Sequence, residues 1–238
     1  MKCIGEEVDL EYVLIRSKRK TISIIVEQDG SVIVKAPAIL SMNEVEAIVL
    51  KKLGWIREKQ KKMHLMEKRT QAKEYVNGEH FLYLGKEYTL LLVEDRVNDV
   101  PEVKILHNQI QVSGKKLSRE IVREALCSWY FEQAKWVIDN QIKMYSAKLG
   151  VRVSKLTLRE AKTRWGSCSS KGAVMINWKI IMAPLEMIDY VVVHELCHLK
   201  HMNHSKNFWD LVASIIPDYK KRRLWLKEHS QIVSNEPG

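Results

Sequence analysis

The hydrophobic pattern of the first hundred residues predicts β-strands. Two runs rich in β-branched residues, 21–26 and 32–35, flank Asp29-Gly30, and an Asp-Gly pair between such runs is a strong hairpin signal. Four further runs have strand character: residues 81–84, 87–93, 103–106 and 109–112. The pattern changes after residues 114–116, so we expect a β-rich N-terminal region over residues 1–115.

One long helix is expected inside this region. Ser41 and Glu44 have the spacing of a capping box, in which each side chain satisfies a backbone N–H at the helix start. Val45, Ile48 and Val49 follow at helical intervals, and the amphipathic pattern then leads into a charged segment. We expect this helix to continue, polar and exposed, to about residue 75.

Residues 116–238 read as helices around a short β-region. A long helix is expected from Ser118 to Gly150, since glycine is favoured just after a helix end. Strands are expected over residues 151–158 and 173–181, with a polar loop over 162–172 between them. Further helices are expected after Pro184, after Ser205 and over 222–229. The expected fold class is α+β, and the sequence shows no internal repeat.

The helix expected after Pro184 carries the pattern His194-Glu195-Leu196-Cys197-His198. Histidines four residues apart stand on the same helix face, where each can offer a ring nitrogen to one metal ion. The intervening glutamate is close enough to take a proton from a water at the metal without being a ligand itself. The flanking residues are apolar, which favours a buried, rigid site with Glu195 as the catalytic base.

A catalytic zinc site usually has three protein ligands and one open position, so a third ligand is needed. His204 is the favoured candidate, because Asn203 suits a bend and Ser205 resembles a helix N-cap. His201 is the rival, although a continuing helix would carry it too far along its axis. Four other side chains are weaker candidates for the metal: Asp210, Glu228, Cys168 and Cys197.

Composition and charge restrict the function less than these motifs do. The chain has 39 Lys and Arg against 29 Asp and Glu, a formal charge of +10, so nucleic acid, a nucleotide or an acidic protein is an allowed partner. The basic residues are dispersed, which is typical of a solvated surface. The four cysteines lack paired spacing, which argues against a disulfide framework. No membrane span or secretory leader is expected, so we expect a cytoplasmic protein.

Several motifs together resemble the YgjP-like metal-dependent hydrolases, bacterial relatives of the SprT-type zincin proteases. The motifs are Arg164–Gly172, Asn177-Trp178, Ala183-Pro184, Asp189–His198 and Asn203–Ser205, with weaker likeness at residues 16–20, 29–30 and 55–56. The resemblance implies a zincin-like C-terminal half, with the HExxH helix packed on a small sheet. It also implies His194, His198 and His204 as ligands of Zn²⁺ and Glu195 as the base.

The resemblance also suggests which residues meet the substrate. Arg164 and Trp165 are expected to border the metal cleft, although Trp165 is equally well explained as a core anchor and Gly166 as a turn. The strand over 174–181 is expected to line the cleft and to pair with an extended substrate, which makes Asn177 and Trp178 substrate-binding candidates.

The motifs and the charge are compatible with three alternative functions. The leading hypothesis is a zinc metallopeptidase. The second is a metal-dependent nucleoside triphosphate (UTP) pyrophosphatase, favoured by the basic charge and Arg164, although a Gly-rich phosphate loop and a carboxylate cluster for Mg²⁺ are not apparent. The third is a basic nucleic-acid or protein-binding module with a structural zinc, which would require a closed site with four ligands.

Overall fold

The computed structural model describes residues 2–5, 8–27, 29–70, 73–95, 99–161 and 163–234, and their side chains except at 2–5, 8–9, 62–70 and 231–234. The chain divides into two compact units, residues 1–71 and 72–238. In the described segments, no helix combines the length and apolar character needed to cross a bilayer.

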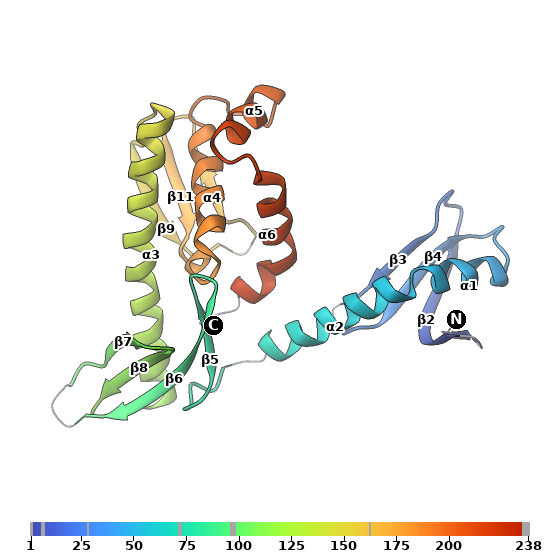
Figure 1. Cartoon of the computed structure of the whole chain (residues 1–238), viewed down its shortest axis with the longest axis horizontal. Helices are drawn as coiled ribbons and strands as arrows, with labels where there is room; N and C mark the ends of the chain where they lie inside the picture. The colour runs from blue at the N-terminus through green and yellow to red at the C-terminus, as the bar shows by residue number, and fades with distance from the viewer. Residues whose placement is uncertain are drawn as a thin grey trace. The chain divides into compact units, whose positions relative to one another are not determined.

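The first unit is a four-stranded sheet followed by two helices (Figure 1). Its strands are β1 (Lys2–Gly5), β2 (Val8–Ser17), β3 (Ser23–Val26) and β4 (Val32–Pro37), in the order β1-β2-β4-β3. The predicted hairpin is confirmed, because β3 and β4 pair antiparallel across Asp29-Gly30. There the Ser31 N–H donates to Asp29 Oδ1 over 2.9 Å.

The helical part of this unit differs from the expected single helix. It consists of α1 (Met42–Lys51) and α2 (Leu53–Thr70), separated at Lys52. The capping box is confirmed: the Glu44 N–H donates to Ser41 Oγ, and the Ser41 N–H donates to the Glu44 carboxylate over 2.8 Å. Local capping therefore set the start of α1, while the break falls at Lys52, two residues before Gly54.

The second unit begins with another four-stranded sheet. Its strands are β5 (His80–Tyr83), β6 (Lys86–Glu94), β7 (Glu102–Leu106) and β8 (Gln109–Gly114), in the order β5-β6-β8-β7. As in the first unit, the two central strands run parallel and each outer strand is antiparallel to its neighbour. The same topology thus occurs twice in a chain whose sequence shows no repeat.

This second sheet shares its core with the helix that follows. Helix α3 (Arg119–Leu149) ends at Gly150, whose φ of 62° is the left-handed geometry expected there. Buried Phe81 and Ile110 belong to the same hydrophobic core as Leu126 and Tyr130, and the Tyr130 hydroxyl donates to the Leu82 carbonyl over 2.8 Å. The compact units therefore do not divide after residue 115, as the sequence pattern suggested, but before residue 73.

A third sheet precedes the C-terminal helices along the chain. Its strands are β9 (Lys155–Arg159), β10 (Gly166–Cys168) and β11 (Ala173–Asn177), in the order β10-β11-β9. A 3₁₀ helix, η1 (Trp178–Met182), leads to α4 (Leu185–Cys197), α5 (Lys206–Ile215) and α6 (Tyr219–Ser234). Helix α4 contacts β10 and β11 on one side and α3, α5 and α6 on others (Figure 1). The fold is α+β, as expected.

Two sequence expectations in this region were wrong. The strand expected to reach residue 181 ends at Asn177, where the Asn177 side chain accepts the Lys179 N–H over 3.1 Å and starts η1. Residues 174–183 are all buried, so the apparent alternation did not distinguish two faces. The polar loop expected over 162–172 contains β10, which is too short to produce a periodic pattern.

The tip of the β5–β6 hairpin is fixed against the start of α4. The Leu84 N–H donates to the Ile181 carbonyl over 2.8 Å, and the Gly85 N–H donates to the Met182 carbonyl over 3.0 Å. Gly85 has a φ of 76°, and a Cβ placed there would lie 2.6 Å from Pro184 Cγ and 2.9 Å from Pro184 Cα. Only glycine fits this position, for both conformational and steric reasons.

We expect Gly85→Ala to lower the free energy of unfolding by about 1–3 kcal/mol, because strain at positive φ adds to overpacking against Pro184. Urea denaturation measures the change. Gly78→Ala is the matched control, since Gly78 has a φ of 89° but open space around its Cβ position. Equal destabilisation by the two substitutions would show that the contact with Pro184 contributes nothing.

Candidate metal centre

Helix α4 lies in the hydrophobic core of the second unit. Val191, Val192 and Val193 are each at most 4% exposed, because the helix is covered by its neighbours along most of its surface. His194 and Glu195 lie in its last turn, and His198 is the residue that ends it. A helix held on several sides leaves little freedom to the side chains at its end.

The chain then turns back so that a third histidine joins the first two. The N–H groups of Lys200 and His201 donate to the Cys197 carbonyl, and the Phe208 N–H donates to Ser205 Oγ at the start of α5. His204 therefore lies in the bend between the two helices. Ring nitrogens of His194, His198 and His204 lie within 4.8 Å of one another, and no carboxylate or thiol of the described residues belongs to this group.

The geometry of the three imidazoles fits one metal ion. His204 Nε2 lies 3.1 Å from His194 Nε2. Two nitrogens bound to one tetrahedral zinc at about 2.0–2.1 Å stand roughly 3.3 Å apart, close to this spacing. The residues present therefore match a three-histidine metal site.

His201 has a supporting place in this arrangement. Its carbonyl lies 3.0 Å from His198 Nδ1, so the protonated Nδ1 donates to that oxygen and the lone pair remains on Nε2. Such a backbone partner commonly orients a metal-binding histidine. The His201 imidazole is not part of the three-nitrogen group, and the same holds for Asp210, Glu228, Cys168 and Cys197.

Two aromatic residues near the start of α5 stack on imidazoles of the site. Phe208 is fully buried and stacks on the His198 ring at 4.5 Å between centroids. Trp209 stacks on the His204 ring at 5.5 Å with an interplanar angle of 22°. The sequence predicts a helix after Ser205 but indicates neither of these contacts.

Burial is the main influence on the pKa values of His194 and Glu195. Burial is the main cause that lowers the pKa of His194, to about 3, and the neighbouring imidazoles of His198 and His204 lower it further. This histidine is neutral at physiological pH, as a metal ligand must be. Burial raises the pKa of Glu195 to about 7, while the Arg164 guanidinium acts in the opposite direction. A carboxyl group with a pKa near neutrality is well suited to accept and return a proton.

Strand β10 lies directly against the Glu195 side chain. A Cβ at Gly166 would be 2.5 Å from Glu195 Oε1 and 2.6 Å from Glu195 Cγ, closer than real Cβ contacts allow. Glycine at position 166 thus creates the space that the carboxylate occupies. The sequence suggests only a turn at Gly166, and nothing local in it indicates this contact.

A cavity of about 360 Å³ opens beside His194 and Glu195. Its wall consists of residues from the loop before β10, from the start of β10, from α4 and from α6: Thr163, Trp165, Gly166, Tyr190, Val191, His194, Glu195, Arg223, Leu226, Lys227 and Ser230. Trp165 therefore borders the cavity. Arg164 is exposed and lies near enough to Glu195 to influence its pKa.

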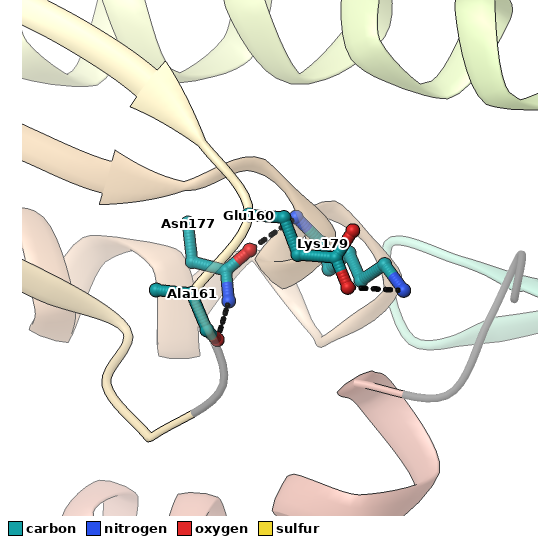
Figure 2. A network of polar contacts seen from close by, with 4 residues as sticks. All are labelled: Glu160, Ala161, Asn177 and Lys179. Atoms are coloured by element: carbon teal, nitrogen blue, oxygen red, sulfur yellow. Dashed lines mark hydrogen bonds and ion pairs between the residues drawn. The ribbon is translucent and has the colours of Figure 1, made fainter.

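Asn177 and Trp178 do not line this cavity. Asn177 is 1% exposed, and its Nδ2 donates to the Ala161 carbonyl over 2.9 Å (Figure 2). Its backbone N–H donates to the Trp165 carbonyl over 2.8 Å. Asn177 thus holds the loop that carries Arg164 and Trp165, and its own amide is already occupied. Trp178 packs edge-on against Phe131 in the core.

An ion pair reinforces the same loop. Lys179 is 5% exposed, and its Nζ lies 3.0 Å from Glu160 Oε1, just beyond the end of β9 (Figure 2). The expected pairing of substrate with β11 is also excluded, because β11 has β10 on one side and β9 on the other. The edge strand nearest Glu195 is β10.

Comparisons with known proteins identify the family of this chain. A family model described as YgjP-like, metallopeptidase domain, matches residues 20–229. The UTP pyrophosphatase of Escherichia coli (strain K12) is 33% identical over 93 residues, which cover 37% of this chain and 56% of that protein. The chain thus matches only about half the length of this curated relative.

A solved structure is also similar over a limited part. It is the crystal structure of the metallopeptidase zymogen of Pyrococcus abyssi abylysin, with 26% identity and a TM-score of 0.35. The similarity covers 38% of this chain and 93% of that one. The family assignment rests on the match over residues 20–229, which spans most of both compact units. The chain belongs to the YgjP-like family, which is defined by a metallopeptidase domain.

Proposed function

We propose that this protein is a zinc-dependent hydrolase, and that it acts as a metallopeptidase. The observation that carries the proposal is the group of three histidine nitrogens beside a buried carboxylate that faces a cavity. Membership of a family defined by a metallopeptidase domain supports it. His194, His198 and His204 are the proposed ligands, and Glu195 is the proposed base.

A zinc ion held by these nitrogens would supply a Lewis acid that polarises the scissile carbonyl and lowers the pKa of water toward about 7. Glu195 accepts the proton from the attacking water and returns it to the leaving amine. Gly166 and the buried last turn of α4 restrict the position of the Glu195 carboxylate, which favours this proton transfer. An extended substrate would add to the free edge of β10, with Trp165 as a wall of the cavity.

Hydrolysis of a nucleoside triphosphate is the second candidate. The similarity to the Escherichia coli UTP pyrophosphatase favours it, as do the cationic side chains of α6 that line the cavity. Against it, the described residues contain no group of carboxylates placed to hold Mg²⁺. The structural-zinc hypothesis is less favoured than either, because the cavity beside His194 and Glu195 fits an open site better than a closed one.

The deciding experiment is a paired assay on the zinc-loaded chain. Cleavage of casein and release of pyrophosphate from UTP are followed under the same conditions. We expect casein cleavage that is lost after chelation and restored by Zn²⁺, with one zinc bound per chain. Pyrophosphate release alone would favour the second candidate. Absence of both activities, or activity that survives chelation, would contradict the proposal of a zinc hydrolase.

A further inference from the structure

The basic run at the start of α6 contains side chains with different surroundings. Arg222 is engaged within the fold: it forms an ion pair with Asp218 at 3.0 Å and donates to the Glu186 carbonyl over 2.9 Å. Arg223 lies on another face and, with Lys227 and Ser230, lines the cavity that holds His194 and Glu195. Residues at intervals of four and seven share one face of a helix, so this face of α6 is turned toward the site.

The ionisable side chains by which α6 lines the cavity are all cationic. Arg223 and Lys227 are exposed, and among the described residues neither forms an ion pair with a carboxylate. The Arg223 guanidinium lies 5.2 Å from the centre of the Trp209 ring, which restricts its orientation. The cavity lining contains a single carboxyl group, that of Glu195. Two unneutralised cations therefore face the space next to the proposed base.

We propose that Arg223 and Lys227 bind an oxyanion group of the substrate, a phosphate or a carboxylate, next to the bond that is cut. This inference rests on the proposed function, because it places the reacting bond at Glu195. Guanidinium and ammonium groups form their strongest hydrogen bonds with such oxyanions. A cavity of about 360 Å³ has room for the anionic end of a small substrate beside His194 and Glu195.

The test measures binding rather than turnover. Isothermal titration calorimetry on the zinc-loaded chain uses inorganic phosphate, an N-acetylated dipeptide with a free carboxylate, and the same dipeptide as its amide. The double variant Arg223→Gln with Lys227→Gln is compared with Lys171→Gln with Lys221→Gln. The control pair removes the same charge from exposed positions outside the cavity lining.

We expect at least one of the two oxyanions to bind, with an affinity about tenfold or more weaker in the Arg223/Lys227 variant and unchanged in the control. Preference for phosphate identifies a phosphorylated substrate, and preference for the free carboxylate over the amide identifies a peptide terminus. Failure of both oxyanions to bind, or equal losses in the two double variants, would overturn the inference. Because no hydrolysis is measured, a failure of the proposed activity would leave this result interpretable.

Discussion

Replacing Glu195 by glutamine should reduce hydrolysis by about 10²–10⁴-fold while zinc remains bound. The amide has nearly the same shape as the carboxylate, so it fits the space beside Gly166 and leaves the three histidines in place. It cannot accept the proton of the attacking water, and this loss affects the reaction step rather than binding. The measurements are kcat/KM on the identified substrate and the zinc content of the purified variant.

Glu186→Gln is the matched control for this prediction. Glu186 is an exposed residue in the first turn of the same helix, so its substitution changes the net charge equally without touching the site. We expect wild-type turnover for it. Retained turnover in Glu195→Gln would refute the role of Glu195 as the base, and loss of zinc would show that the carboxylate also supports the metal.

Substituting alanine for Gly166 should lower kcat by about 100-fold, because a displacement of the order of 1 Å in a catalytic group has an effect of that size. The added methyl would come within 2.5 Å of Glu195 Oε1, and the carboxylate must move away from β10 to relieve the overlap. Zinc affinity should change little, since the three imidazoles are held by α4, the following bend and α5. Kinetics and zinc titration on the same samples separate the two effects.

The contribution of Gly166 can be tested through its dependence on Glu195. In the Glu195→Gln background the same Gly166→Ala substitution should cause almost no further loss, because residues that act together are not additive. Gly114→Ala is the control, since a Cβ there would meet its neighbours at 3.4 Å or more. A full additional loss in the Glu195→Gln background would mean that Gly166 acts through strand stability and not through the carboxylate.

The grouping of the three histidines was predictable because most of it is local in sequence. His194, Glu195 and His198 occupy one helical stretch, and four-residue spacing alone places the two histidines on one face. His204 follows within ten residues of His194, and the Ser205 cap signal indicated the bend between them. The start of α1 and the left-handed Gly150 were predictable for the same reason, because capping depends on neighbouring residues.

The surroundings of the site were not predictable, because they bring together residues far apart in the chain. Gly166 meets Glu195 across 29 positions, and the cationic face of α6 reaches the same cavity from Arg223 onward. Asn177 was expected to bind substrate, but its amide is committed to the Ala161 carbonyl. In a region where every residue is buried, polarity no longer indicates which way a side chain points.

The sequence by itself determined the α+β class, most element positions and the placement of His194, Glu195 and His198 on one helix, because helical periodicity, turns and caps depend on adjacent residues. Only the tertiary structure decided that strands β5 to β8 share a core with α3, that β10 and not β11 is the edge strand beside Glu195, and that Arg223 faces the cavity. These features depend on which surfaces pack together, and packing is selected by the burial of whole elements rather than by any short pattern.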